Sequence, residues 1–88
     1  MATSVDPFAS IEAAEDFLAL LAGDLDDVAA GLLGRARSAL RKGERRRFEV
    51  LQLVGVRVRQ LQQEVGTSRR LLRHLRQIRE LLLGAVTG

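Results

Sequence analysis

The sequence predicts an all-α protein that folds as one long antiparallel helical hairpin, and three observations support this fold class. Apolar residues recur at intervals of three and four along both halves of the 88-residue chain, which is the spacing of one helical face. Gly43 lies near the middle of the chain and follows Arg41 and Lys42, an arrangement common at helix C-termini. Residues 1–34 carry seven acidic and no basic residues, whereas residues 35–88 carry fourteen basic and four acidic residues. Antiparallel halves would therefore have complementary charge.

The first helix is predicted near residues 7–42. Asp6 can cap a helix, and Pro7 is tolerated at a first helical position, where its missing N–H costs nothing. Gly23 followed by the capping residue Asp24 is a candidate break, but the apolar pattern passes Gly23 without a change of phase, so break and continuation both stay open. The apolar seam consists of Ile11, Ala14, Leu18, Leu21, Leu25, Val28 and Leu32, and continues less regularly through Ala36 and Leu40.

The second helix is predicted near residues 44–84. The stretch VGVRVRQL alternates as a strand would, but its apolar residues also step by three and four, and residues 60–64 contain three Gln and one Glu, which favour a helix. Gly66, Thr67 and Ser68 form a second candidate break. If that break is a turn, the alternative is a three-helix bundle with helices near 7–42, 44–65 and 68–84. The seam of this half is Leu51, Val54, Val58, Leu61, Val65, Ser68, Leu72, Leu75 and Leu82.

The segment RRLLRHLRQIRELLLG, residues 69–84, is a clean amphipathic helix, with Leu71, Leu75, Ile78 and Leu82 on one face and arginines opposite. In a hairpin centred on Gly43, residues whose numbers add up to about 86 lie at one height. The paired levels are Glu12, Glu15 and Asp16 with Arg70 to His74, Asp26 and Asp27 with Arg59 and Gln60, and Arg35 and Arg37 with Glu49. The sequence therefore predicts that the acidic and basic halves pair within the fold.

Length and composition limit the kinds of site that the chain can hold. A chain of 88 residues forms a single helical domain, 1–88. It has no Cys and only one His, His74, so a disulfide is excluded, a zinc site is disfavoured and no cofactor is expected. No apolar run approaches the roughly 20 residues of a membrane span, and no basic segment of the secretory type opens the chain. We expect a cytoplasmic protein, since the absence of Cys fits a reducing compartment.

No residue pattern predicts an enzyme. A lone His74 without a nucleophile or a metal partner is more often structural or exposed than catalytic. The carboxylates Glu12, Glu15 and Asp16 are explained by arginines on the opposite helix. Gly31 and Gly34 follow no strand and match no phosphate-binding loop. We therefore expect a non-enzymatic protein.

The apolar surface is wider than a single seam, which predicts association. A two-helix hairpin offers each helix only one neighbour, and apolar residues beside the seam would stay uncovered. A second copy packed face to face would give a four-helix bundle, and a helical protein partner would serve equally. The function predicted is that of a small interaction or assembly subunit. The candidate partner-binding face consists of Phe17, Leu20, Leu33, Phe48, Val50, Leu53, Leu81 and Leu83.

A nucleic-acid-binding protein is the alternative function, because fourteen basic residues give a pI near 11.0 and clustered arginines attract phosphates. Against this reading, no helix-turn-helix pattern is convincing, and aromatic residues are not interleaved with basic ones as in modules that stack on bases. Pairing of the arginines within the fold is the interpretation that we favour. The candidate basic patch consists of Arg45, Arg46, Arg47, Arg69, Arg70, Arg73 and Arg76.

Overall fold

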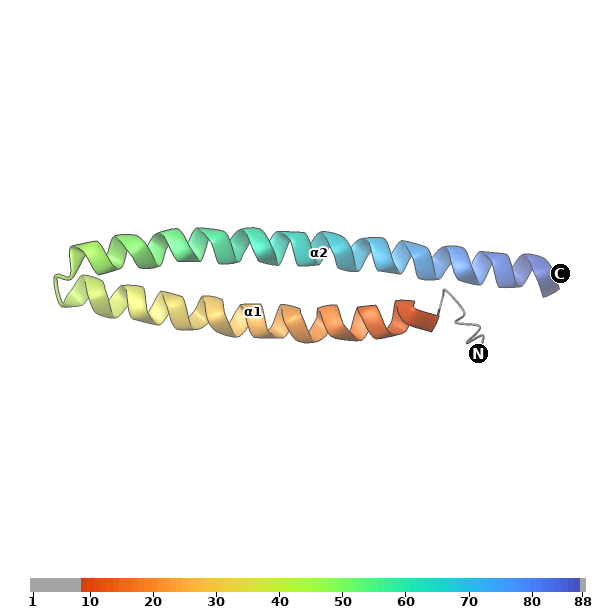
Figure 1. Cartoon of the computed structure of the whole chain (residues 1–88), viewed down its shortest axis with the longest axis horizontal. Coiled ribbons are helices and arrows are strands. Elements are labelled where there is room, and N and C mark those ends of the chain that lie inside the picture. Colours follow the sequence, from red (N-terminus) through yellow and green to blue (C-terminus); the bar gives the residue numbers. More distant parts are fainter. Residues whose placement is uncertain (1–8, 88) are drawn as a thin grey trace, which may run out of the picture.

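The protein is a helical hairpin of two long antiparallel α-helices (Figure 1). The structure, a computed structural model, describes residues 9–87, with the side chains of residues 10–84. Helix α1 spans Ala9–Arg41 and helix α2 spans Arg45–Thr87. The predicted all-α hairpin is confirmed, while the predicted start at Asp6 and Pro7 lies outside the described residues. The radius of gyration is 19.9 Å, against about 12 Å for a compact domain of this length. The hairpin is therefore long and thin, 67 × 31 × 14 Å.

The turn between the helices is a glycine-terminated Schellman motif. Gly43 has a φ of 72°, a left-handed conformation that is costly for residues with a Cβ. This conformation lets the N–H of Glu44 donate to the carbonyl of Ala39 at 2.9 Å and the N–H of Gly43 donate to that of Leu40 at 3.2 Å, the two bonds that define the motif. Helix α2 starts at once, since the N–H of Phe48 donates to the carbonyl of Glu44 at 3.0 Å. The predicted turn at Gly43 is thus confirmed.

Both candidate breaks are absent, because Gly23 lies inside α1 and Gly66 lies inside α2. The three-helix alternative is therefore wrong. A single glycine costs a helix only about 1 kcal/mol, and the continuous packing along the hairpin outweighs this cost. Thr67 does not cap a new helix: its hydroxyl donates to the carbonyl of Gln63 at 3.1 Å, one turn back, as helical Thr side chains do.

The helices meet along one main heptad stripe on each, together with the adjacent heptad positions four residues farther on. Among the described residues only Ile11, Ala39, Val58 and Val65 are buried, because each helix has a single neighbour. The adjacent positions include small residues of α1, such as Ala22 and Ala29, and Gly55 of α2, which are half-buried. The stripes repeat every seven residues, through Ile11, Leu18, Leu25, Leu32 and Ala39 of α1 and through Leu51, Val58, Val65, Leu72 and Arg79 of α2.

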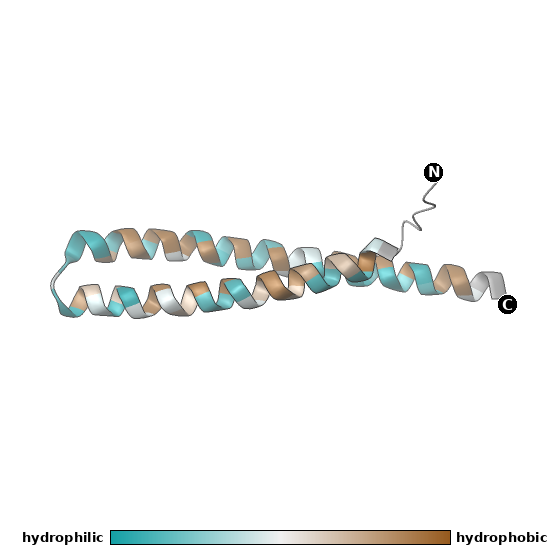
Figure 2. Cartoon of the chain, turned by 60° about the horizontal axis from the view of Figure 1, so that its bottom comes forward, coloured by the Kyte–Doolittle hydropathy of each residue, from teal (hydrophilic) through white to brown (hydrophobic). Residues whose placement is uncertain are grey.

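Part of the predicted seam does not face the other helix. In α1, Val28 is 48% exposed and Leu40 is also exposed. In α2 most of a second heptad stripe is exposed, namely Val54, Leu61, Leu75 and Leu82, together with Leu71 and Ile78 beside it, while Ser68 of the same stripe is half-buried. The prediction was wrong for these residues because α2 has two neighbouring apolar stripes, and its other stripe faces α1. Hydrophobic residues accordingly recur along the full length of both helices (Figure 2).

Neither helix, within residues 9–87, contains a stretch that is apolar and uncharged enough to cross a membrane.

Candidate protein-protein interface

One side of the hairpin, which we call the apolar flank, combines exposed apolar residues of both helices. In an antiparallel pair, corresponding heptad positions of the two helices lie on the same side. The heptad positions that lie one and four residues before the main contact stripe therefore share this flank in both helices. All its α2 members are exposed, as are Phe17 and Val28 of α1, whereas Ala14 and Leu21 are half-buried. The apolar flank consists of Ala14, Phe17, Leu21 and Val28 of α1 and of Val50, Val54, Leu61, Leu71, Leu75, Ile78 and Leu82 of α2.

The opposite side, which we call the polar flank, carries opposite charges on the two helices. Its α1 positions include Glu12, Asp16 and Asp26, and its α2 positions include Arg59, Arg70 and Arg73. The amide Nε2 of Gln62 donates to Oδ1 of Asp26 at 2.8 Å, which links the two helices near mid-length. Polar groups of the polar flank therefore find some of their partners within the hairpin. The exposed side chains of the apolar flank have no such partners there.

Two ion pairs join the helices at their open end. Glu12 pairs with Arg79, and Oε2 of Glu15 lies 3.6 Å from a guanidinium nitrogen of Arg76. The hydrogen bond from Arg79 is the main cause that holds the pKa of the Glu12 carboxyl below its usual 4.5. A backbone hydrogen bond and the charges of Arg79 and Arg76 act in the same direction, while partial desolvation opposes them.

The predicted pairing between the acidic and basic halves is confirmed at the open end, although its arginine partners lie farther along the chain than predicted. The predicted approach of Arg35 and Arg37 to Glu49 is not observed, since Glu49 pairs with Arg45 of its own helix.

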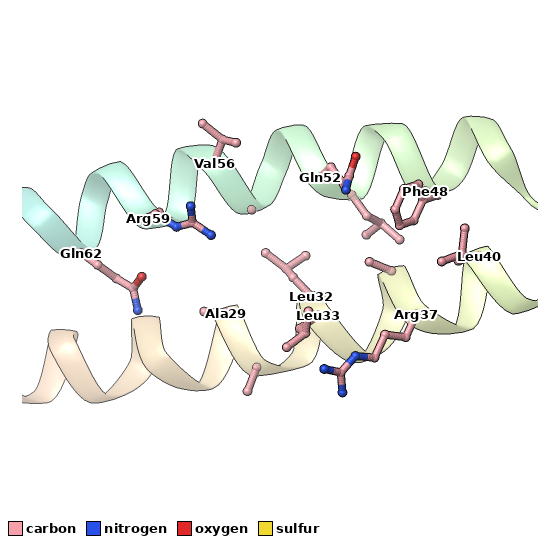
Figure 3. A pocket seen from close by; sticks show the side chains of 14 residues that line it. Ala29, Leu32, Leu33, Arg37, Leu40, Phe48, Gln52, Val56, Arg59 and Gln62 are labelled. Carbon is pink, nitrogen blue, oxygen red and sulfur yellow. The ribbon is translucent and has the colours of Figure 1, made fainter.

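An open groove of about 790 Å³ lies between the helices toward the turn (Figure 3). It is wide because small residues line it, including Ala29, Ala30 and Gly55. Phe48 and Leu40 lie at its turn end, and Arg59 and Gln62 lie at its other end (Figure 3). A hollow of about 410 Å³ adjoins it at the turn, between Leu40 and Gln52. Both open on the side of the polar flank.

The structure divides the predicted partner-binding face among several surfaces. Phe17 and Val50 belong to the apolar flank. Leu33 and Phe48 line the groove on the other side. The remaining members are exposed and lie on the outermost faces of the helices or near the end of α2, and they are Leu20, Leu53, Leu81 and Leu83.

Most residues of the apolar flank were missed as surface residues because sequence reasoning assigned them to the inner seam. A signal that could have found them was present. Glu12 and Glu15 are three residues apart, as are Arg76 and Arg79, so the two glutamates can pair with the two arginines. When α2 is rotated so that these arginines face α1, Leu75 and Leu82 face outward.

The predicted basic residues do not form one patch. Arg45 lies 4.0 Å from Glu49, and Arg47 lies 4.0 Å from Glu44, both beside the turn. Arg69, Arg70, Arg73 and Arg76 lie roughly 35 Å farther along α2, at 1.5 Å per residue, and Arg76 pairs with Glu15. Arg46 is exposed beside the turn. The seven arginines thus form two small, separate clusters, one beside the turn and one farther along α2. Three of the seven pair with carboxylates.

Within residues 9–87 the chain holds no group of three His, Cys, Asp or Glu side chains that could bind a metal ion, and no polar or charged residue in this part is buried. His74 is exposed on the outer face of α2.

Comparison with protein-family models, with curated proteins and with solved structures finds no match to this chain.

Proposed function

We propose that this protein is a small, non-enzymatic interaction or assembly subunit that binds a second copy or another helical protein through its apolar flank. One observation carries the proposal. In the described residues, four apolar residues are buried, while sixteen large apolar side chains are exposed, nine of them on the apolar flank. An apolar surface that extends over both helices of a small protein typically marks an interface.

The total accessible surface supports the same proposal. The chain exposes 7134 Å², whereas a compact monomer of 9.7 kDa would expose about 5,100 Å². The difference of about 2,000 Å² is for one chain and exceeds the roughly 800 Å² that each partner buries in a standard interface. Association along the apolar flank would complete the burial of leucine and valine side chains that are about half exposed. Each would contribute about half of the roughly 1.5–3 kcal/mol that complete burial of an exposed side chain gives.

Two neighbouring valines of α2 provide a matched test. Val54 belongs to the apolar flank and is 42% exposed, whereas Val56 lies on the other side of α2 and is 50% exposed. We expect light scattering after size exclusion to give a mass above 9.7 kDa that rises with concentration. Val54→Glu should lower that mass toward the monomer, while Val56→Glu should leave it close to the wild type.

A compact monomer at every concentration that also binds no hydrophobic dye would contradict the proposal. Equal losses from both valine variants would show instead that association does not use the apolar flank.

A further inference from the structure

We infer that a second copy of this chain covers the apolar flank head to tail, so that the two turns lie at opposite ends of an antiparallel four-helix bundle. The inference rests on the proposed function and specifies its partner and geometry. It comes from the charged residues that lie among the apolar ones on the same flank.

Away from the turn, four exposed charged residues occupy heptad positions of the apolar flank, namely Asp24, Arg35, Arg57 and Glu64. Arg47 occupies such a position beside the turn, where it pairs with Glu44. The four residues away from the turn form an acidic band, Asp24 with Glu64, and a basic band, Arg35 with Arg57.

The two residue numbers add up to 88 in the acidic band and to 92 in the basic band, and in an antiparallel hairpin residues at similar heights have similar sums. The contacts observed across the hairpin, Asp26 with Gln62 and Glu15 with Arg76, add up to 88 and 91. The charged ends of the side chains in each band therefore lie at about one height across the hairpin, and the basic band lies nearer the turn.

Head-to-tail packing places the acidic band of one copy on the basic band of the other. Asp24 then meets the partner's Arg35, and Arg57 meets the partner's Glu64. A two-fold axis across the hairpin must pass midway between the members of each pair, at positions 29.5 of α1 and 60.5 of α2. These positions add up to 90, which agrees with the observed cross-helix contacts. One axis thus serves both helix pairs and creates four ion pairs per dimer.

The alternative, with both turns at the same end, brings like charges together. There α1 lies beside α2 of the partner at the same height, so Asp24 faces the partner's Glu64 and Arg35 faces the partner's Arg57. Like-charge contacts of this kind disfavour a partner or a direction of packing. The four charged residues therefore select the head-to-tail arrangement.

The apolar residues fit the same axis. Val28 and Leu61 are the members of the apolar flank nearest to positions 29.5 and 60.5, and both are about half exposed in the single hairpin. Gly31, on the same side of α1, has open space around it and allows the two α1 backbones to approach closely. The centre of the bundle would thus be apolar, with the ion pairs on either side of it.

Spin labels on single cysteines test the direction directly, because the chain has no Cys of its own. Arg46→Cys labels the end of the hairpin at the turn, and Asp27→Cys labels a site close to the axis; both residues are exposed. Head-to-tail packing predicts a distance between copies of about 40 Å for Arg46→Cys, from 1.5 Å per residue on either side of the axis, and roughly 20 Å for Asp27→Cys. Roughly 20 Å at both sites would overturn the arrangement and leave the proposed function intact.

A charge variant tests the ion pairs. Glu64→Arg should weaken dimerisation about tenfold, since it converts two attractive contacts per dimer into repulsive ones. The exchange Arg57→Glu with Glu64→Arg should restore most of the affinity. Glu80→Arg, on the polar flank, is the matched control and should change the affinity little. An unchanged dimer in Glu64→Arg, or a wild type that stays monomeric at every concentration, would overturn the inference.

Discussion

Glu15 and Arg76 place their charged groups 3.6 Å apart although, counted from the turn, Arg76 lies about five residues farther along its helix than Glu15 does. Glu12 and Arg79 have the same offset. Side chains of an α-helix lean toward its N-terminus. Glu15 therefore leans away from the turn and Arg76 leans toward it, so the two side chains converge. Arg70, which is level with Asp16, also leans toward the turn, where its guanidinium donates to the hydroxyl of Thr67 at 3.1 Å.

The Glu12–Arg79 pair makes the open end of the hairpin sensitive to acid. Because the folded state lowers the pKa of Glu12, the stabilisation is fully present above the unfolded value of 4.5 and is lost as pH falls through the lower folded pKa. We expect the protection of amides against exchange in the first turns of α1 to fall below about pH 4.5, relative to the protection of amides beside the turn. Glu12→Gln should remove most of this pH dependence, and a pH profile that the variant leaves unchanged would contradict the assignment.

The ion pairs at the open end should also depend on salt. Replacing Glu12 and Glu15 with Lys places four positive charges together and should lower the melting temperature. The loss should be larger at about 0.02 M salt than at about 1 M salt, because ions screen exposed charges. Thermal unfolding at the two ionic strengths measures this difference. Losses that are equal at both would mean that packing, and not charge, connects the helices there.

The glycines at the turn and inside α1 should respond in opposite directions to alanine. Neither Gly43 nor Gly23 has an atom within 4 Å of an added Cβ, so only the backbone decides the effect. Gly43→Ala should destabilise the protein by about 1 kcal/mol, because its φ of 72° is left-handed. Gly23→Ala should stabilise it by about 0.5–1 kcal/mol, since alanine favours a helix. Urea unfolding of both variants checks the signs, and destabilisation by Gly23→Ala would indicate a break in α1.

The separation of the basic residues predicts weak binding of nucleic acid. A gel-shift titration with duplex DNA and single-stranded RNA at physiological ionic strength should show no submicromolar complex, because three of the seven candidate arginines already pair with carboxylates. Weak binding at low salt should disappear as salt increases. Submicromolar binding that Arg45→Ala, Arg46→Ala and Arg47→Ala together abolish would favour the nucleic-acid function instead.

The sequence by itself determined the hairpin. Gly43 after two basic residues specifies a helix end, heptad spacing specifies two amphipathic helices, and the uneven distribution of charge specifies their antiparallel pairing. The glycine and the heptad spacing are local signals, and the charge signal depends only on the summed charge of each half. All three can therefore be recognised without knowing which residues are in contact. The continuity of α1 through Gly23 was left open, because a glycine next to a capping residue has the same local signature in a turn and in a long helix.

Only the tertiary structure decided which stripe of α2 faces α1. The stripe through Val54, Leu61, Leu75 and Leu82 is at least as apolar as the stripe through Val58 and Leu72 that is used, so hydrophobicity along the chain could not choose between them. Contacts between distant residues made the choice. Turning α2 so that Arg76 and Arg79 reach Glu15 and Glu12 leaves the other stripe exposed. The rotation of a helix about its own axis is set by the partner it packs against, and this rotation created the apolar flank.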